Sequence, residues 1–296
     1  MLLPTIALLA QSGGLVPQLD LVDVHVSASA QGVEARALAV EPTAEAAFDA
    51  LILEPDANGQ LVRTGALEGQ VLRYGTPSIS ATRAVGRDGS GVVRVWERAA
   101  DVWRLGPDLG LSPVTGPTTP PAVIVDVDRE RSVVLHRLDG LLVIHDLSTP
   151  GQPVLEASFP ASLPRYVLDL AIDGDFVVLL EGDLPFFNFQ LLGDLEIRVL
   201  ERTPAGWIDR GTVEPPPGID WTRSAVRSID ADDGRIAAGA QFGTPADPCG
   251  RVVVYERNGS GTYSLSDILR PPSQCSIAPG QATQFGFWVD LGGSEV

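Results

Sequence analysis

Short apolar segments alternate with polar turns along the chain, and the clearest unit runs from Arg227 to Leu269. Short apolar runs with β-branched residues predict strands here, and Asp-Gly and Asn-Gly pairs predict hairpin turns that join them. Four strands are expected: Val226 to Asp230, Arg235 to Ala240, Arg251 to Glu256 and Thr262 to Leu269. The pattern therefore predicts a four-stranded antiparallel meander.

The third strand of this unit, a run of aliphatic residues that ends in an acid, recurs upstream. Its five copies are Phe48 to Glu54, Val92 to Glu97, Leu141 to Asp146, Leu195 to Glu201 and Arg251 to Glu256. The terminal acids are 43, 49, 55 and 55 residues apart. Repetition at such a period is typical of stacked or radial repeat folds.

A hairpin precedes each copy of this strand. In the second unit, for example, we expect Gln70 to Tyr74 to pair with Ile79 to Val85. The expected units are residues 17–67, 68–112, 119–160, 164–214, 221–271 and a partial sixth at 282–296. Radial repetition of four-stranded antiparallel sheets predicts an all-β chain with a β-propeller fold, five recognisable blades and a partial sixth, in an incomplete ring of six or seven.

Two segments resemble a known repeat. Gly234 to Ala240 with Gly250 to Gly261, and Ala84 to Arg98, are similar to the FG-GAP repeat, and Gln284 to Phe287 looks like the Phe-Gly opening of another copy. This family is related to the integrin α-subunit propeller. The resemblance implies about seven blades and, for the bacterial members, a secreted or surface-anchored protein.

Charge narrows the classes of partner. The 296 residues carry a net charge of −17, with a pI of about 4.4, and arginine supplies all the basic side chains. Such an acidic surface disfavours nucleic acid and anionic membranes. Apolar runs are too short to span a bilayer. Residues 1–16 are interpreted as either a short signal peptide or an N-terminal strand.

Two candidate sites lie at the turns of the last complete unit. Cys249 and Cys275 fall in loops at the same end of the predicted meander, which allows a disulfide, the alternative being two free thiols. Asp230 and Asp232 flank a turn where integrin-type repeats carry a longer calcium loop, but short Asp-Gly clusters also favour plain β-turns. No cofactor is otherwise expected.

Other side chains could bear chemistry. Acids lie on or beside the expected first strands, where they could form a general acid–base pair or simply contact solvent: Asp23, Asp126, Asp169, Asp230 and Asp290. The histidines His25, His136 and His145 form no ligand motif, and we expect them to pack. Phe186, Phe187 and Phe189 lie in one loop and form either a contact patch or a cover for a blade edge.

These patterns leave three classes of function open. The first is a secreted or surface-exposed, non-catalytic binding scaffold whose protein or carbohydrate ligand the sequence does not identify. The second is a hydrolase-like propeller enzyme with acids at a central channel. The third is a structural module of a larger, truncated surface protein. We assign no catalytic residue from the sequence.

Overall fold

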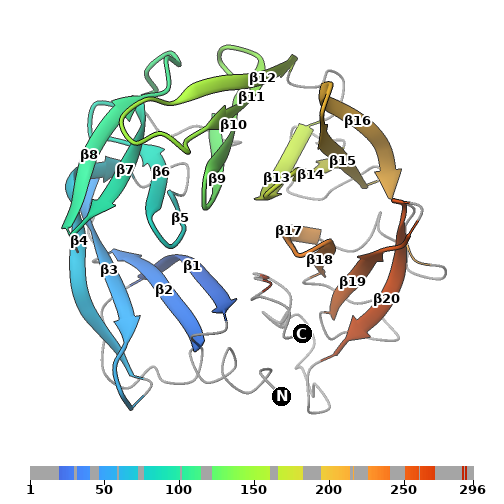
Figure 1. Cartoon of the computed structure of the whole chain (residues 1–296), viewed down its shortest axis with the longest axis horizontal. Coiled ribbons are helices and arrows are strands. Elements are labelled where there is room, and N and C mark those ends of the chain that lie inside the picture. The colour runs from blue at the N-terminus through green and yellow to red at the C-terminus, as the bar shows by residue number, and fades with distance from the viewer. Residues whose placement is uncertain are drawn as a thin grey trace, which may run out of the picture. The chain divides into compact units, whose positions relative to one another are not determined.

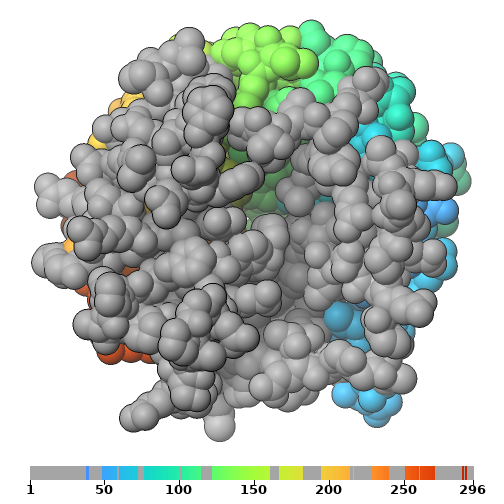
Figure 2. Space-filling view, turned by 180° about the vertical axis from the view of Figure 1, so that it is seen from behind, coloured from blue at the N-terminus to red at the C-terminus, as the bar shows by residue number. Residues whose placement is uncertain are grey.

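The computed structural model describes residues 20–29, 32–40, 47–58, 60–72, 77–100, 102–114, 122–160, 166–182, 195–213, 216, 226–240, 251–259, 261–270, 289 and 291. All other residues are drawn in grey (Figures 1 and 2). The described part forms twenty strands and contains no helix. Accordingly, this part holds no helix of a length and hydropathy that would cross a membrane.

The first eight strands form two meanders that share one sheet. Their bounds are β1 Asp20–Ser29, β2 Gly32–Val40, β3 Ala47–Pro55, β4 Leu61–Leu72, β5 Ser78–Ile79, β6 Arg83–Arg87, β7 Val93–Ala99 and β8 Val102–Asp108. The sheet order is β1-β2-β3-β4-β8-β7-β6-β5, and all pairs are antiparallel except β4 with β8. That parallel contact is the single pair Leu67 and Trp103.

The remaining strands form three four-stranded sheets (Figure 1). Their orders are β12-β11-β10-β9, β13-β14-β15-β16 and β17-β18-β19-β20. The bounds are β9 Val123–Asp128, β10 Arg131–His136, β11 Leu141–Asp146, β12 Val154–Pro160, β13 Tyr166–Asp173, β14 Phe176–Gly182, β15 Glu196–Thr203, β16 Gly206–Val213, β17 Val226–Asp232, β18 Arg235–Ala240, β19 Arg251–Arg257 and β20 Tyr263–Leu269. The predicted fold class, an all-β chain of propeller-type four-stranded antiparallel blades, is confirmed.

The recurrent aliphatic strands occupy the third position of every meander, as β3, β7, β11, β15 and β19. One predicted pairing is wrong. Gln70 to Leu72 continue β4 and pair with β3, whereas the partner of β6 is the short strand β5. Gly69 has a left-handed φ of 81°, and the register shifts beside it, so β4 bulges instead of ending.

The chain divides into two compact units, residues 1–130 with 147–154, and residues 131–146 with 155–296. In the first unit, the core contains Trp96 and Trp103, packed with Leu38, Ile52 and other apolar side chains. Trp96 is fully buried, and its indole N–H donates a hydrogen bond to the Glu68 carbonyl at 2.9 Å. Both tryptophan side chains are therefore packing residues of this core.

In the second unit, one core joins the sheet β13–β16 to the sheet β17–β20. Val178, Leu180, Ile197, Ile236 and Tyr255 are among its buried members. Their alternation along each strand places every second side chain on the face between the two sheets. Tyr255 holds the place in β19 that Trp96 holds in β7, so the aromatic residue of the repeat packs in both units.

Candidate functional site

A pocket of about 360 Å³ lies in the second unit, which is within the size range of small-molecule sites. Seven of its lining residues are apolar and three are charged. They are Leu135, Leu142, Phe159, Pro160, Val167, Leu179, Glu181, Arg198, Leu200 and Asp209. The wall is therefore largely apolar, with its polar groups drawn from three adjacent strands, β14, β15 and β16.

Strand register explains why the charged residues meet. Arg198 of β15 pairs with Leu179 of β14, and Glu181 lies two residues farther along β14 on the same face. Asp209 of β16 pairs with Leu200, two residues from Arg198 and also on that face. These three residues, named here the charged triad, are thus diagonal neighbours on one side of the sheet.

The charged triad is closely bonded. The Nε of Arg198 lies 3.1 Å from Oε2 of Glu181, and its Nη1 lies 2.9 Å from Oδ2 of Asp209. The backbone N–H of Gly211 donates to the other oxygen of Asp209 at 2.7 Å. Glu181 is 1% exposed and Asp209 is 44% exposed, so one carboxylate is buried and the other lies at the solvent edge.

Electrostatics keep the arginine charged. Burial by itself would lower the pKa of Arg198, but the two carboxylates outweigh burial and raise the pKa above its usual value. Among the described residues, Nη2 of Arg198 has no hydrogen-bond partner. Nη2 is therefore the guanidinium nitrogen of this lining residue that can still donate to a bound molecule.

The first-strand acids whose side chains are described accept hydrogen bonds from distant segments of the chain. In the first unit, Asp126 of β9 accepts a hydrogen bond from the Ser78 hydroxyl of β5 at 2.7 Å. In the second unit, Asp169 of β13 accepts one from the Ile229 N–H of β17 at 3.0 Å. Asp230 of β17 accepts one from the Leu291 N–H. The side chain of Asp23 and the whole of Asp290 lie outside the described residues.

The two acids considered for calcium have different partners. Asp230 bonds to the Leu291 backbone, and Asp232 lies 3.5 Å from the guanidinium of Arg235, a cation that would oppose a bound metal. The described residues hold no group of three His, Cys, Asp or Glu side chains placed to share a metal ion. The plain turn stays the prediction for these acids, and calcium stays its untested alternative.

The other candidates fall into two groups. Cys249, Cys275, Phe186, Phe187 and Phe189 all lie outside the described residues, as does the side chain of His25. His136 of β10 and His145 of β11 are buried, and Nδ1 of His136 lies 3.1 Å from the Asp139 carboxylate. Both described histidines are therefore packed within the β10–β11 hairpin, as expected.

Sequence reasoning missed a set of ion pairs that connect successive meanders. In each, the arginine that follows the acid of a third strand contacts an acid of the preceding meander. These inter-sheet ion pairs are Arg98 with Glu54 at 3.4 Å, Arg202 with Glu156 at 2.9 Å and Arg257 with Glu201 at 2.7 Å. The repeated Glu-Arg dipeptides at 97–98, 201–202 and 256–257 were the available signal.

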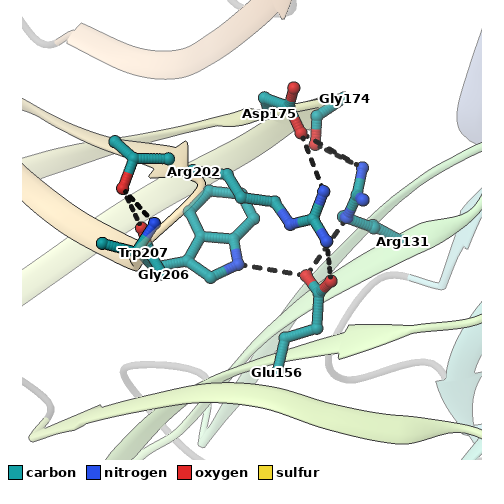
Figure 3. Close-up of polar contacts among 9 residues, drawn as sticks. Arg131, Glu156, Gly174, Asp175, Arg202, Gly206 and Trp207 are labelled. Carbon is teal, nitrogen blue, oxygen red and sulfur yellow. Dashed lines mark hydrogen bonds and ion pairs between the residues drawn. The ribbon is translucent and has the colours of Figure 1, made fainter.

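The most extensive of these contacts centres on Glu156 (Figure 3). Its carboxylate accepts hydrogen bonds from the Arg131 Nε at 3.1 Å and from the Trp207 indole at 3.0 Å, beside the Arg202 pair. Both arginines also lie near Asp175, at 3.5 and 3.6 Å. This network joins β10 and β12 to β15, β16 and the β13–β14 turn, so its role is structural.

Neither a family model nor a curated protein matches this sequence. Among solved structures, the chain is similar to the periplasmic gluconolactonase PpgL of Pseudomonas aeruginosa, with 18% identity over 82% of this chain and 69% of that one, and a TM-score of 0.44. It is also similar to a chain of a nidogen/laminin complex, with 10% identity, coverage of 86% and 82%, and a TM-score of 0.47. A third is the N-terminal domain of Nup159, with 11% identity, coverage of 89% and 82%, and a TM-score of 0.41.

Proposed function

We propose that this protein is a non-catalytic binding scaffold that acts outside the cell or at its surface and holds a small ligand in the pocket of the second unit. The observation that carries the proposal is the combination of an apolar wall with a preformed charged triad. Sites for small molecules commonly pair an apolar lining with a few fixed polar groups. The charged triad is fixed by strand register and by the burial of Glu181.

The hydrolase alternative requires acids that are free to exchange protons with a substrate. Asp126 and Asp169 each accept a hydrogen bond from a neighbouring first strand, and Asp230 accepts one from the Leu291 backbone. A carboxylate that accepts backbone or hydroxyl hydrogen bonds is stabilised in its charged form, which suits a structural acceptor better than a proton donor. This engagement supports the scaffold over the enzyme.

The test is binding of Nile red, a neutral apolar fluorophore, to the whole chain. Phe159→Trp narrows the pocket, and we expect it to weaken the fluorescence enhancement. Leu155→Trp is the matched control, because Leu155 lies on the same strand, is 56% exposed and is not part of the pocket wall. Equal binding by the two variants would contradict a ligand in this pocket.

The same preparation is assayed for hydrolysis of gluconolactone. We expect no turnover above the spontaneous rate. Turnover that disappears in a folded Asp169→Asn variant would favour the hydrolase and overturn the scaffold.

A further inference from the structure

We propose that the ligand of the pocket is an electrically neutral molecule with an apolar chain or ring and one carbonyl-type oxygen, which accepts a hydrogen bond from Nη2 of Arg198. This inference rests on the proposed binding function and adds the chemical class of the ligand. Three features of the wall carry it: the free donor, the balance of charge and the apolar area.

The free donor defines the polar end of the ligand. Arg198 uses Nε for Glu181 and Nη1 for Asp209, which leaves Nη2 as the nitrogen without a partner in the described part of the chain. An N–H group needs an acceptor, and a hydrogen bond from a charged donor is stronger than one between neutral groups. A ketone, ester or amide oxygen meets this requirement.

The charges of the charged triad and its free donor disfavour an ionic ligand. The charged triad has two carboxylates and one guanidinium, so its net charge is negative. A ligand carboxylate at Nη2 would lie close to both Glu181 and Asp209, and like charges that close together repel. A ligand ammonium has no lone pair, so it cannot accept a hydrogen bond from Nη2 of Arg198.

The apolar wall defines the rest of the ligand. Leu135, Leu142, Phe159 and Leu179 are among the seven apolar side chains that surround the charged triad. A polyhydroxylated ligand such as a sugar would place several hydroxyl groups against them without partners, and each unpaired polar group is costly to bury. A hydrocarbon chain or ring would instead gain from burial there.

The experiment titrates the whole chain at neutral pH with octanamide, octanoate, octylamine and glucose, and follows the leucine methyl signals of Leu135 and Leu142 by NMR. The first three probes share one alkyl chain and differ only in the head group. We expect octanamide to bind about tenfold more tightly than octanoate or octylamine, and glucose not to bind. Tighter binding of octanoate, octylamine or glucose would overturn the inference.

A pair of variants tests the donor itself. Arg198→Lys retains a positive charge but lacks the guanidinium fork, and we expect it to weaken octanamide binding about tenfold. Arg210→Lys is the control, because Arg210 pairs with Glu201 outside the pocket wall and should leave the affinity unchanged. Unchanged affinity in a folded Arg198→Lys variant would also overturn the inference.

The outcomes distinguish failure of the inferred ligand class from failure of the proposed binding function. If the alkyl probes bind with equal affinity whatever their head group, the pocket binds ligands but the inferred class is wrong. If no probe shifts the two leucine signals, the proposed binding function itself fails.

Discussion

Replacing Glu156 by alanine should destabilise the second unit more than any other single change in its network of polar contacts (Figure 3). The carboxylate is 12% exposed and contacts Arg131, Arg202 and the Trp207 indole at the same time. The substitution removes the acceptor and leaves three donors without it.

The magnitude follows from the burial of each partner. An indole N–H that loses its acceptor costs about 1 kcal/mol. Arg131 is 16% exposed, so its pair is worth about 1–2 kcal/mol, below the value for a fully buried pair. Arg202 is 40% exposed, and its pair contributes about 0–1 kcal/mol. Because the contacts share one carboxylate, they are not additive, and we expect a total of about 3 kcal/mol.

The assay is urea unfolding followed by tryptophan fluorescence. Glu156→Gln retains an oxygen that accepts from the Trp207 indole but loses the charge, and we expect a cost of about 1–2 kcal/mol. Asp175→Ala is the matched control: it removes a carboxylate that faces the same two arginines but is 55% exposed, and should cost less than about 1 kcal/mol. An Asp175→Ala cost equal to or above that of Glu156→Ala would refute the reasoning.

Three further predictions use the same unfolding assay. Tyr255→Phe should stabilise the chain by about 1 kcal/mol, because the buried hydroxyl has no hydrogen-bond partner among the described residues, and a destabilised variant would contradict this. Burial alone would raise the pKa of Glu201, but hydrogen bonds from two arginines lower the pKa below its ordinary value. The charged carboxylate therefore stabilises the folded state above the pKa of the unfolded chain, and this stability is lost as the pH falls through the pKa of the folded state. The stability advantage of wild type over Glu201→Gln should accordingly shrink between pH 5 and pH 3. Gly86→Ala would place a Cβ 2.7 Å from the Cβ of Pro77 and should cost about 1–3 kcal/mol. Gly182→Ala meets the ends of two leucine side chains, Leu195 and Leu168, which can rotate, and should cost less; the reverse order would refute the packing argument.

The sequence predicts most of the strands because their signals are local. Aliphatic alternation and turn residues such as Asn258-Gly259 act within a few positions, and the five aliphatic strands that end in an acid all occupy the predicted place in their sheets. The error at Gln70 has a local cause as well. Glycine at position 69 is compatible with a turn or a bulge, and only the pairing with β3 shows which one forms.

The pocket could not be predicted in the same way. Glu181, Arg198 and Asp209 lie on three strands, and a shift of one residue in either register would place them on opposite faces. The pocket around them also depends on strands β10 to β13, whose side chains complete its wall. The residues of a single strand show neither its register with the neighbouring strands nor the side chains from other strands that complete the pocket wall.

In the three ion pairs made by the arginines of the Glu-Arg dipeptides, the acid comes earlier in the chain than the arginine. Such a contact is heterologous: the later meander of each pair supplies the arginine and the earlier one supplies the acid. Arg202 and Arg257 hold the same place in their meanders, but Arg202 contacts Glu156 of a fourth strand and Arg257 contacts Glu201 of a third strand. Glu256 holds the place in β19 that Glu201 holds in β15, so a second copy of the β17–β20 meander placed after the first would find an acid for its own arginine.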